Sequence, residues 1–371
     1  MGIASSLKML AVVVAGCGVV AGELPAAAPP APDTAPAATA AANELVVGAV
    51  QDAKEPLMRV TFEAGALAKE YPAKIRDANK KLVYEIACPA GTVHEGSVTV
   101  SRWKAARWPA EWPAGGMKVS GVAGFFTYDA SAKGVVAWHV NFADPEVFGF
   151  YGGPLLAQDE LQVAEHPLLA SVREALLGKK LSTLTVEAGL STPILVMGVQ
   201  RRVKVATEPS VARPEGLYGN RFKRADEKTV RDAVTRIERP TISNIVALAA
   251  PTCGRGAYTI DELQLILETA YTGFRAAKAE SGDKLQVEMH TGFWGCGAFG
   301  GNRTVMVALQ LAAARLAGID EIVIHWGDKA GEMDFQSGLE AYEEATKAGN
   351  VSAFLKALEK KAYRWGVSDG N

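Results

Sequence analysis

Cysteine and histidine are scarce in this chain of 371 residues, and neither forms a recognisable metal or redox pattern. There are four cysteines and five histidines, and no two cysteines have the C-x-x-C spacing. Structural zinc sites and disulfide frameworks need such residues close together and in sufficient number. The sequence therefore predicts neither a zinc site nor a disulfide-stapled fold, and it implies no metal or redox cofactor.

An excess of charge of one sign is also missing. Lysine and arginine total 39 and aspartate and glutamate total 41, which leaves a formal net charge of −2. A protein that binds duplex nucleic acid usually carries a basic patch or stripe, so the composition argues against that partner. With 49% hydrophobic residues, the chain is long enough to bury a sizeable core.

The first apolar run, residues 9–15, is too short to span a bilayer as a helix. It suits the apolar part of a signal peptide, and Val14-Ala15-Gly16-Cys17 resembles a bacterial lipobox, in which the cysteine is lipidated. Met1-Gly2-Ile3-Ala4-Ser5-Ser6 also satisfies the myristoylation pattern, and a plain signal peptide is a third interpretation. We therefore expect residues 1–17 to be a leader that can attach the protein to a membrane through Cys17.

Residues 18–43 are rich in alanine and proline and contain almost no charged or aromatic side chains. Such a segment cannot bury enough apolar surface to offset its ordering entropy, so we expect a disordered spacer. A leader followed by a spacer predicts an exported, membrane-anchored lipoprotein, periplasmic or on the cell surface. A cytoplasmic location is the alternative.

The remaining chain divides into an N-terminal accessory region, residues 44–118, and a larger domain, residues 119–371. In the larger domain, apolar β-branched runs such as residues 135–144, 241–251 and 320–326 read as strands, and they alternate with helical patterns. A capping box begins at Thr259, and Asn302 and Gly318 bracket another helix. This alternation predicts an α/β fold with a mainly parallel sheet flanked by helices and the N-terminal region packed on it.

One loop stands out, the segment HTGFWGCGAFGGN at residues 290–302, which holds five glycines, three aromatic residues and a cysteine. It joins the end of a predicted strand to the start of a predicted helix, where ligands bind in open α/β sheets. Glycines let backbone N–H groups approach an anion, and a helix N-terminus favours negative charge. The loop matches neither the nucleoside-triphosphate nor the dinucleotide fingerprint, so a bound phosphate or diphosphate and a tight structural turn are the two interpretations.

With the helix after it and the later VIHWGD, this loop resembles the carboxyl-terminal signature of poly(ADP-ribose) glycohydrolases, whose catalytic unit is a macrodomain. In that family the loop reads close to T-G-N-W-G-C-G-x-F-G-G-D and wraps the diphosphate of ADP-ribose. The resemblance implies that Trp326 replaces the adenine-stacking phenylalanine, while Phe293 stands at an asparagine position. The loop residues that it assigns to the substrate are Gly292, Gly295, Cys296, Gly297, Ala298, Phe299, Gly300 and Gly301.

The family's other signature is a strand ending in Val-Asp-Phe-Ala-Asn, then three glycines and Gln-Glu-Glu. Here the corresponding stretch is VNFADPEVFGFYGGPLLAQDEL, with the family's spacing from Asn141 to Gln158. The family's Asp and Asn are exchanged at Asn141 and Asp144, the glycines read Phe148-Gly149-Phe150, and the first glutamate is Asp159. A tyrosine-bearing loop that covers the ribose has only Tyr218 as a weak candidate. The resemblance implies substrate contacts for Asn141, Asp144 and Gln158.

By the same resemblance, Glu160 is the catalytic acid and base, and Asp159 binds ribose hydroxyls. Cleavage of a ribose–ribose bond needs an acid for the leaving oxygen and a base for water, and one partly buried glutamate can do both in succession. The expected activity is hydrolysis of poly(ADP-ribose), or of a related O-linked ADP-ribosyl group, to ADP-ribose. The alternatives are a non-catalytic ADP-ribose-binding module and a hydrolase of another nucleotide diphosphate. On residues alone, 158–160 are also an ordinary polar first turn of a helix.

Overall fold

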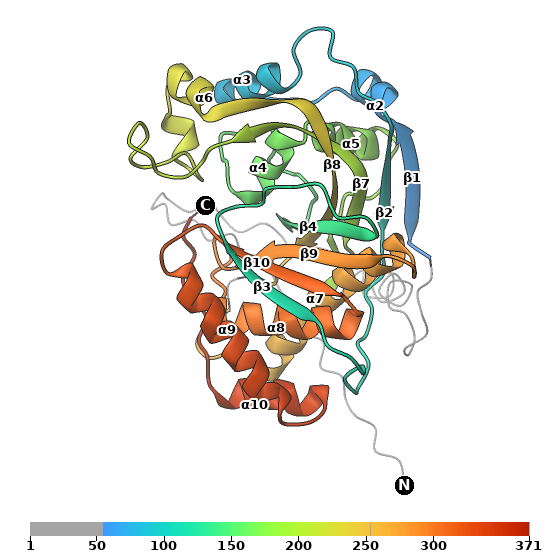
Figure 1. Ribbon diagram of the computed structural model, residues 1–371, viewed down its shortest axis with the longest axis vertical. Helices are drawn as coiled ribbons and strands as arrows, with labels where there is room; N and C mark the ends of the chain where they lie inside the picture. The colour runs from blue at the N-terminus through green and yellow to red at the C-terminus, as the bar shows by residue number, and fades with distance from the viewer. Residues whose placement is uncertain (1–54, 253, 371) are drawn as a thin grey trace, which may run out of the picture.

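The computed structural model describes residues 55–252 and 254–370 (Figure 1). The predicted leader, the lipidation candidate Cys17 and the Ala/Pro-rich spacer lie outside the described residues. Within the described ranges, no helix is both long enough and apolar enough to cross a membrane.

The centre of the molecule is one eight-stranded sheet with the order β1-β2-β7-β8-β4-β9-β10-β3. The strands are β1 (Met58–Glu63), β2 (Ser97–Arg102), β3 (Lys118–Ala123), β4 (Val135–Ala143), β7 (Ile194–Val205), β8 (Val234–Ala249), β9 (Gln286–Gly292) and β10 (Glu321–Trp326). A separate two-stranded sheet pairs β5 (Val186–Glu187) with β6 (Leu190–Ser191).

The sheet has a parallel part and an antiparallel part. Strands β8, β4, β9, β10 and β3 run parallel to one another. Strands β1, β2, β7 and β8 pair antiparallel. The predicted mixed, mainly parallel α/β sheet is confirmed. The N-terminal region 44–118 supplies β1 and β2 at one edge of this sheet and the first residue of β3 at the other.

Helices cover both faces of the sheet (Figure 1). They are α2 (Ala64–Glu70), α3 (Ala78–Ala87), α4 (Gln158–Glu165), α5 (Leu168–Gly178), α6 (Glu227–Ala233), α7 (Ile260–Ser281), α8 (Arg303–Ala317), α9 (Gly331–Thr346) and α10 (Val351–Lys360), with a short 3₁₀ turn at Phe222–Arg224. Because successive side chains of a strand point to opposite faces, β8 serves two cores. Val246 and Leu248 pack with α7 and α8, and Ile245 and Ala247 pack with α2 and α5.

The predicted helix boundaries near the glycine loop are confirmed. Thr259 and Glu262 form the capping box of α7. Asn302 caps α8 by accepting from the backbone N–H of Val305, and Gly318 ends that helix in the left-handed conformation at φ 70°. The N-terminal caps are hydrogen bonds from side chain to backbone within one turn, and the C-terminal cap is a backbone conformation that glycine favours. Both depend on neighbouring residues, so the local sequence reveals them.

Two segments follow their sequence patterns only in part. The run GVAGFFTY, residues 121–128, has the apolar pattern of a strand, but β3 ends at Ala123 because the chain turns at Gly124, whose φ is 102°. Residues 69–87 have a helical pattern with a proline inside, and they divide between α2 and α3 on either side of Pro72, which has no N–H for a continuing helix. The short helix α6 was not anticipated.

Candidate active site

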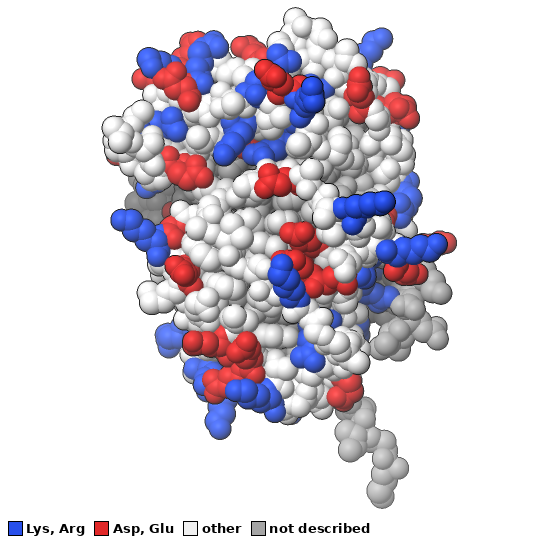
Figure 2. All heavy atoms as spheres, in the orientation of Figure 1, with Lys and Arg blue, Asp and Glu red and all other residues white. Residues whose placement is uncertain are grey.

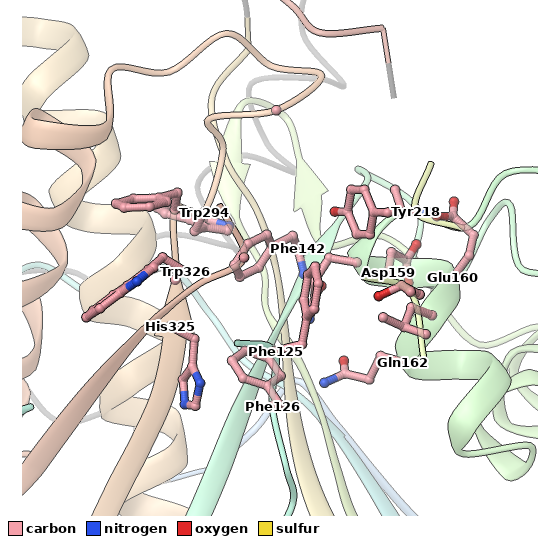
Figure 3. A pocket seen from close by; sticks show the side chains of 18 of the residues that line it. Phe125, Phe126, Phe142, Asp159, Glu160, Gln162, Tyr218, Trp294, His325 and Trp326 are labelled. Carbon is pink, nitrogen blue, oxygen red and sulfur yellow. Dashed lines mark hydrogen bonds between the residues drawn. The ribbon is translucent and has the colours of Figure 1, made fainter. Parts of the chain in front are cut away.

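The carboxyl ends of β4, β9 and β10 open into one cavity of about 860 Å³ (Figure 3). Residues 292–299 of the glycine loop, Gln158 to Gln162 of α4 and Trp326 at the end of β10 all line it. This edge of a parallel sheet is where the topology leaves room for a ligand. Two segments separated by about 130 positions in the sequence thus share one cavity.

Several glycines of the loop are required by close packing. A Cβ on Gly292 would lie 2.7 Å from the carbonyl oxygen of His325, and one on Gly301 would lie 2.8 Å from that of Gly295. Gly295 itself has a φ of 75° and leaves no room beside Ala250. The indole N–H of the buried Trp294 donates to the Leu248 carbonyl at 3.0 Å and anchors the loop to β8. The tight-turn interpretation therefore accounts for these three glycines.

Gln158 fixes the start of α4 against β4. Its side-chain oxygen accepts from the backbone N–H of Phe142 at 2.7 Å, and its amide donates to the Val140 carbonyl at 3.0 Å. These two bonds replace ladder bonds at the end of the strand, so α4 begins directly beside the cavity. The next two residues, Asp159 and Glu160, are held at the wall opposite Trp326 (Figure 3).

Both carboxyl groups are buried, with 5% exposure at Asp159 and 2% at Glu160. Burial raises the pKa of Glu160, although the positive charge of Lys80 opposes the shift. Burial and the neighbouring Glu160 raise the pKa of Asp159 well above its usual range. Glu160 also accepts from the N–H of Ala157 at 3.0 Å, which leaves its second oxygen for other partners. The pair therefore binds a proton more readily than exposed carboxyl groups do.

The positive charge of Lys80, in α3, lowers the pKa of both carboxyl groups. Lys80 is 1% exposed, and its ammonium donates to the Tyr151 carbonyl at 3.2 Å. Burial lowers its pKa to about 8, while Glu160 and Asp159 raise it. Sequence reasoning missed Lys80, because nothing in a helix of the N-terminal region signals a buried lysine.

Aromatic side chains line the rest of the cavity. Trp326 stacks on Phe335 with ring centroids 5.6 Å apart. Across the cavity, Tyr218 stacks on Phe125 at 5.4 Å and lies beside Asp159 and Glu160 (Figure 3). Tyr218, the weak candidate for a ribose-covering tyrosine, is therefore a cavity residue.

The two phenylalanines that replace glycines of the family's pattern lie in different surroundings. Phe148 is fully buried and takes a left-handed conformation, with φ 53°, that glycine adopts without strain. Phe150 is 55% exposed and lines the cavity. A position that is glycine in the family's pattern therefore carries a large apolar side chain in the same cavity as the carboxylates.

The structure brings most of the predicted site residues to the cavity wall, with three exceptions. Those that line it are Asp144, Gln158, Asp159, Glu160, Gly292, Gly295, Cys296, Gly297, Ala298, Phe299 and Trp326. Asn141, Gly300 and Gly301 lie behind the wall. Burial raises the pKa of the Cys296 thiol, so it is not a thiolate nucleophile at neutral pH.

Four of the five histidines, which are far apart in the sequence, meet beneath the cavity. The rings of His139 and His290 stack at 4.6 Å, and Nδ1 of His290 lies 3.0 Å from Nε2 of His325. His166 is linked to them through Tyr128. Burial lowers the pKa of His166 to about 3 and that of His325 to about 4, so both are neutral near pH 7. Within the described residues, no group of three or more His, Cys, Asp or Glu could hold a metal ion.

Residues 194–332 match the family model described as poly(ADP-ribose) glycohydrolase (PARG), macro domain fold. Over these residues the chain is similar to the poly(ADP-ribose) glycohydrolase family. The PARG match contains the glycine loop and Trp326 but begins after Asp159 and Glu160. A search of curated proteins gives no match.

Solved PARG structures resemble this chain at low identity. PARG from Thermomonospora curvata is 14% identical, with a TM-score of 0.43 over 71% of this chain and 99% of that one. The same enzyme bound to the inhibitor ADP-HPD is 16% identical, with the same TM-score and coverage. PARG from Deinococcus radiodurans in complex with ADP-ribose is 13% identical, with a TM-score of 0.37 over 76% of this chain and 94% of that one.

Proposed function

We propose that the protein hydrolyses the ribose–ribose O-glycosidic bond of poly(ADP-ribose), or of a related O-linked ADP-ribosyl group, and releases ADP-ribose. The observation that carries this proposal is that the glycine loop and the Asp159–Glu160 pair line the same cavity. The first is the kind of backbone that binds phosphate, and the second supplies the acid and base that glycoside cleavage needs.

In this proposal the substrate lies across the cavity from Trp326 to Glu160. The adenine base stacks on Trp326, since any flat aromatic face serves a nucleobase. The diphosphate lies against the cavity-lining loop residues, of which Gly297 and Ala298 are the central ones. The terminal ribose then reaches Asp159, whose second carboxyl oxygen has no partner among the described residues.

Glu160 carries the chemistry in two steps. Its protonated carboxyl, favoured by burial, donates a proton to the leaving ribose oxygen as the C–O bond breaks through an oxocarbenium-like transition state. The resulting carboxylate takes a proton from water, whose oxygen forms the new bond to the anomeric carbon. The proton balance closes, because Glu160 ends in the protonated form in which it began.

A non-catalytic ADP-ribose-binding module is the second candidate, and Phe150 is the observation that favours it. Its exposed side chain lines the cavity that also contains the carboxylates, at a position where the family's pattern has glycine. A phenyl group there competes for volume with the terminal ribose. A displacement of about 1 Å at the reacting atoms can reduce the rate roughly 100-fold.

The test is release of ADP-ribose from poly(ADP-ribose) by the full chain, by Glu160→Gln and by the matched control Glu238→Gln, whose side chain is exposed on β8. We expect release by the full chain and the control, and a loss of at least about 100-fold in Glu160→Gln with ADP-ribose binding retained. Binding without release in all three proteins establishes the binding module. Absence of both binding and release refutes the proposed function.

A further inference from the structure

A segment near the end of the described chain, residues 364–370, crosses the glycine loop. The backbone N–H of Gly366 donates to the Gly300 carbonyl at 2.8 Å, and that of Asp369 donates to the Gly297 carbonyl at 3.4 Å. On the far side, the Asn220 side chain donates to the Gly370 carbonyl at 2.8 Å. The segment is therefore held from both sides of the cavity mouth.

Trp365 anchors this segment where it arrives at the loop. Its ring stacks on Tyr258 at 4.3 Å, and its backbone N–H donates to the Gly256 carbonyl at 2.9 Å. Tyr258 in turn accepts from the backbone N–H of Asn302, the residue that caps α8. The path of residues 366–370 is thus tied to the same framework that shapes the glycine loop.

The side chain of Asp369 faces the cavity. A Cβ built on Gly297 would lie 3.3 Å from one carboxylate oxygen of Asp369 and 3.6 Å from the other. Asp369 is itself a cavity-lining residue, and its negative charge contributes to the raised pKa of Tyr218. A carboxylate is therefore seated on the part of the loop that we assign to the diphosphate.

We propose that residues 367–370 act as an internal competitor for the phosphate site, with the Asp369 carboxylate in the place of a substrate phosphoryl group. This inference rests on the proposed function, because it assumes that the loop binds a diphosphate. Two like charges at contact distance repel strongly in a partly buried site, so a diphosphate and the Asp369 carboxylate do not occupy the loop together. Ligand binding must displace the segment, and the energy of displacement reduces the apparent affinity.

This competition makes Asp369 a specificity-determining residue. Its carboxylate lowers the affinity for ligands that carry phosphate groups and leaves the affinity for ligands without phosphate unchanged. ADP-ribose must displace the carboxylate, whereas adenosine, which needs only the Trp326 end of the cavity, need not. A side chain that merely supports the fold would alter the affinity of both ligands alike.

The experiment measures binding of ADP-ribose and of adenosine by calorimetry to four proteins. They are the unaltered chain, Asp369→Asn, a chain that stops after Gly366, and the control Asp283→Asn. Asp283 is exposed after α7 and gives the same charge change away from the cavity. We expect Asp369→Asn and the shortened chain to bind ADP-ribose about tenfold more tightly, with adenosine affinity unchanged and the control equal to the unaltered chain.

A second measurement follows the segment itself. Hydrogen exchange at the backbone amides of Gly366 and Asp369 should accelerate when ADP-ribose is added and should not respond to adenosine. The inference alone fails if the unaltered chain binds ADP-ribose and both variants bind it equally or less tightly, since Asp369 is then neutral or a ligand contact. If no form binds ADP-ribose, the proposed function and this inference fail together.

Discussion

The side-chain amide of Asn141, near the end of β4, donates a hydrogen bond of 2.9 Å to the carboxyl group of Asp159 at the start of α4. Asn141 is fully buried and lies behind the cavity wall. It thus orients Asp159 and has no surface of its own for a substrate. Where the family's pattern has aspartate, Asn141 gives Asp159 a neutral hydrogen-bond donor. An aspartate at position 141 would place a second buried carboxyl group beside Asp159.

Replacing Asn141 by leucine removes this donor and leaves the Asp159 carboxyl without a partner on that side. We expect the free energy of unfolding in urea to fall by about 1–3 kcal/mol, the usual cost of an unsatisfied buried polar group. Asn141→Asp should behave differently, because two adjacent buried carboxyls retain a proton and raise the folded-state pKa. Its stability should decline relative to the unaltered chain as the pH rises above about 4. Equal stability of all three proteins would contradict this role.

Lys80 is expected to set the pH range in which the Asp159–Glu160 pair titrates. Because the Lys80 charge lowers the pKa of Glu160, Lys80→Met should raise the apparent pKa of the pair. Activity should decline at high pH because Glu160 loses the proton that it donates. In Lys80→Met this decline of kcat/KM should therefore occur at a higher pH. The exposed neighbour provides the control Lys81→Met, whose profile should match that of the unaltered chain. A profile that falls in height without moving would indicate a structural role only.

Trp326 is expected to bind the adenine base. Trp326→Ala should weaken ADP-ribose binding by about 1–3 kcal/mol, the typical range for a base stacked on an aromatic ring, and Trp326→Phe should restore most of it. Ribose 5-phosphate, which lacks the base, should bind all three proteins equally. A parallel loss for both ligands would point to disruption through Phe335, on which Trp326 stacks.

The histidine cluster should make the protein sensitive to acid. Burial lowers the pKa of His166 to about 3 in the fold, from about 6.5 in an exposed histidine, so the unfolded chain binds more protons below about pH 6.5. Stability is therefore lost as the pH falls from about 6.5 to about 3. Glu165, with a pKa raised to about 7, acts with the opposite sign. Comparing the unaltered chain with His166→Asn isolates the contribution of His166 to the pH dependence of stability.

In urea unfolding between pH 7 and pH 4, His166→Asn should reduce the acid-induced loss of stability by up to about 1.4 kcal/mol per pH unit. Asparagine retains a donor, and the neutral histidine uses its Nδ1 proton for the Gln162 carbonyl at 2.8 Å. Parallel pH curves for the two proteins would show that His166 does not titrate on unfolding.

Local sequence signals were sufficient for much of the site. The glycine loop, the cap at Asn302 and the position of Glu160 on a first helical turn all follow from residues a few positions apart. The sequence left a phosphate site and a tight turn as two interpretations of the loop, and Gly292 and Gly295 are required for close packing against His325 and Ala250. That distinction requires the positions of atoms from distant strands, which no local pattern encodes.

The amino-acid sequence by itself determined most of the strand and helix pattern, the placement of the loop at a strand-to-helix junction and the residue types available for chemistry. Hydrophobic periodicity and capping act over one or two turns, so they are readable along the chain. Only the tertiary structure decided that the charge of Lys80 acts on Glu160, that four separate histidines meet under the cavity and that Asp369 rests on Gly297. Electrostatic and steric effects depend on distance in space, and the folded sheet brings together residues that the sequence keeps far apart.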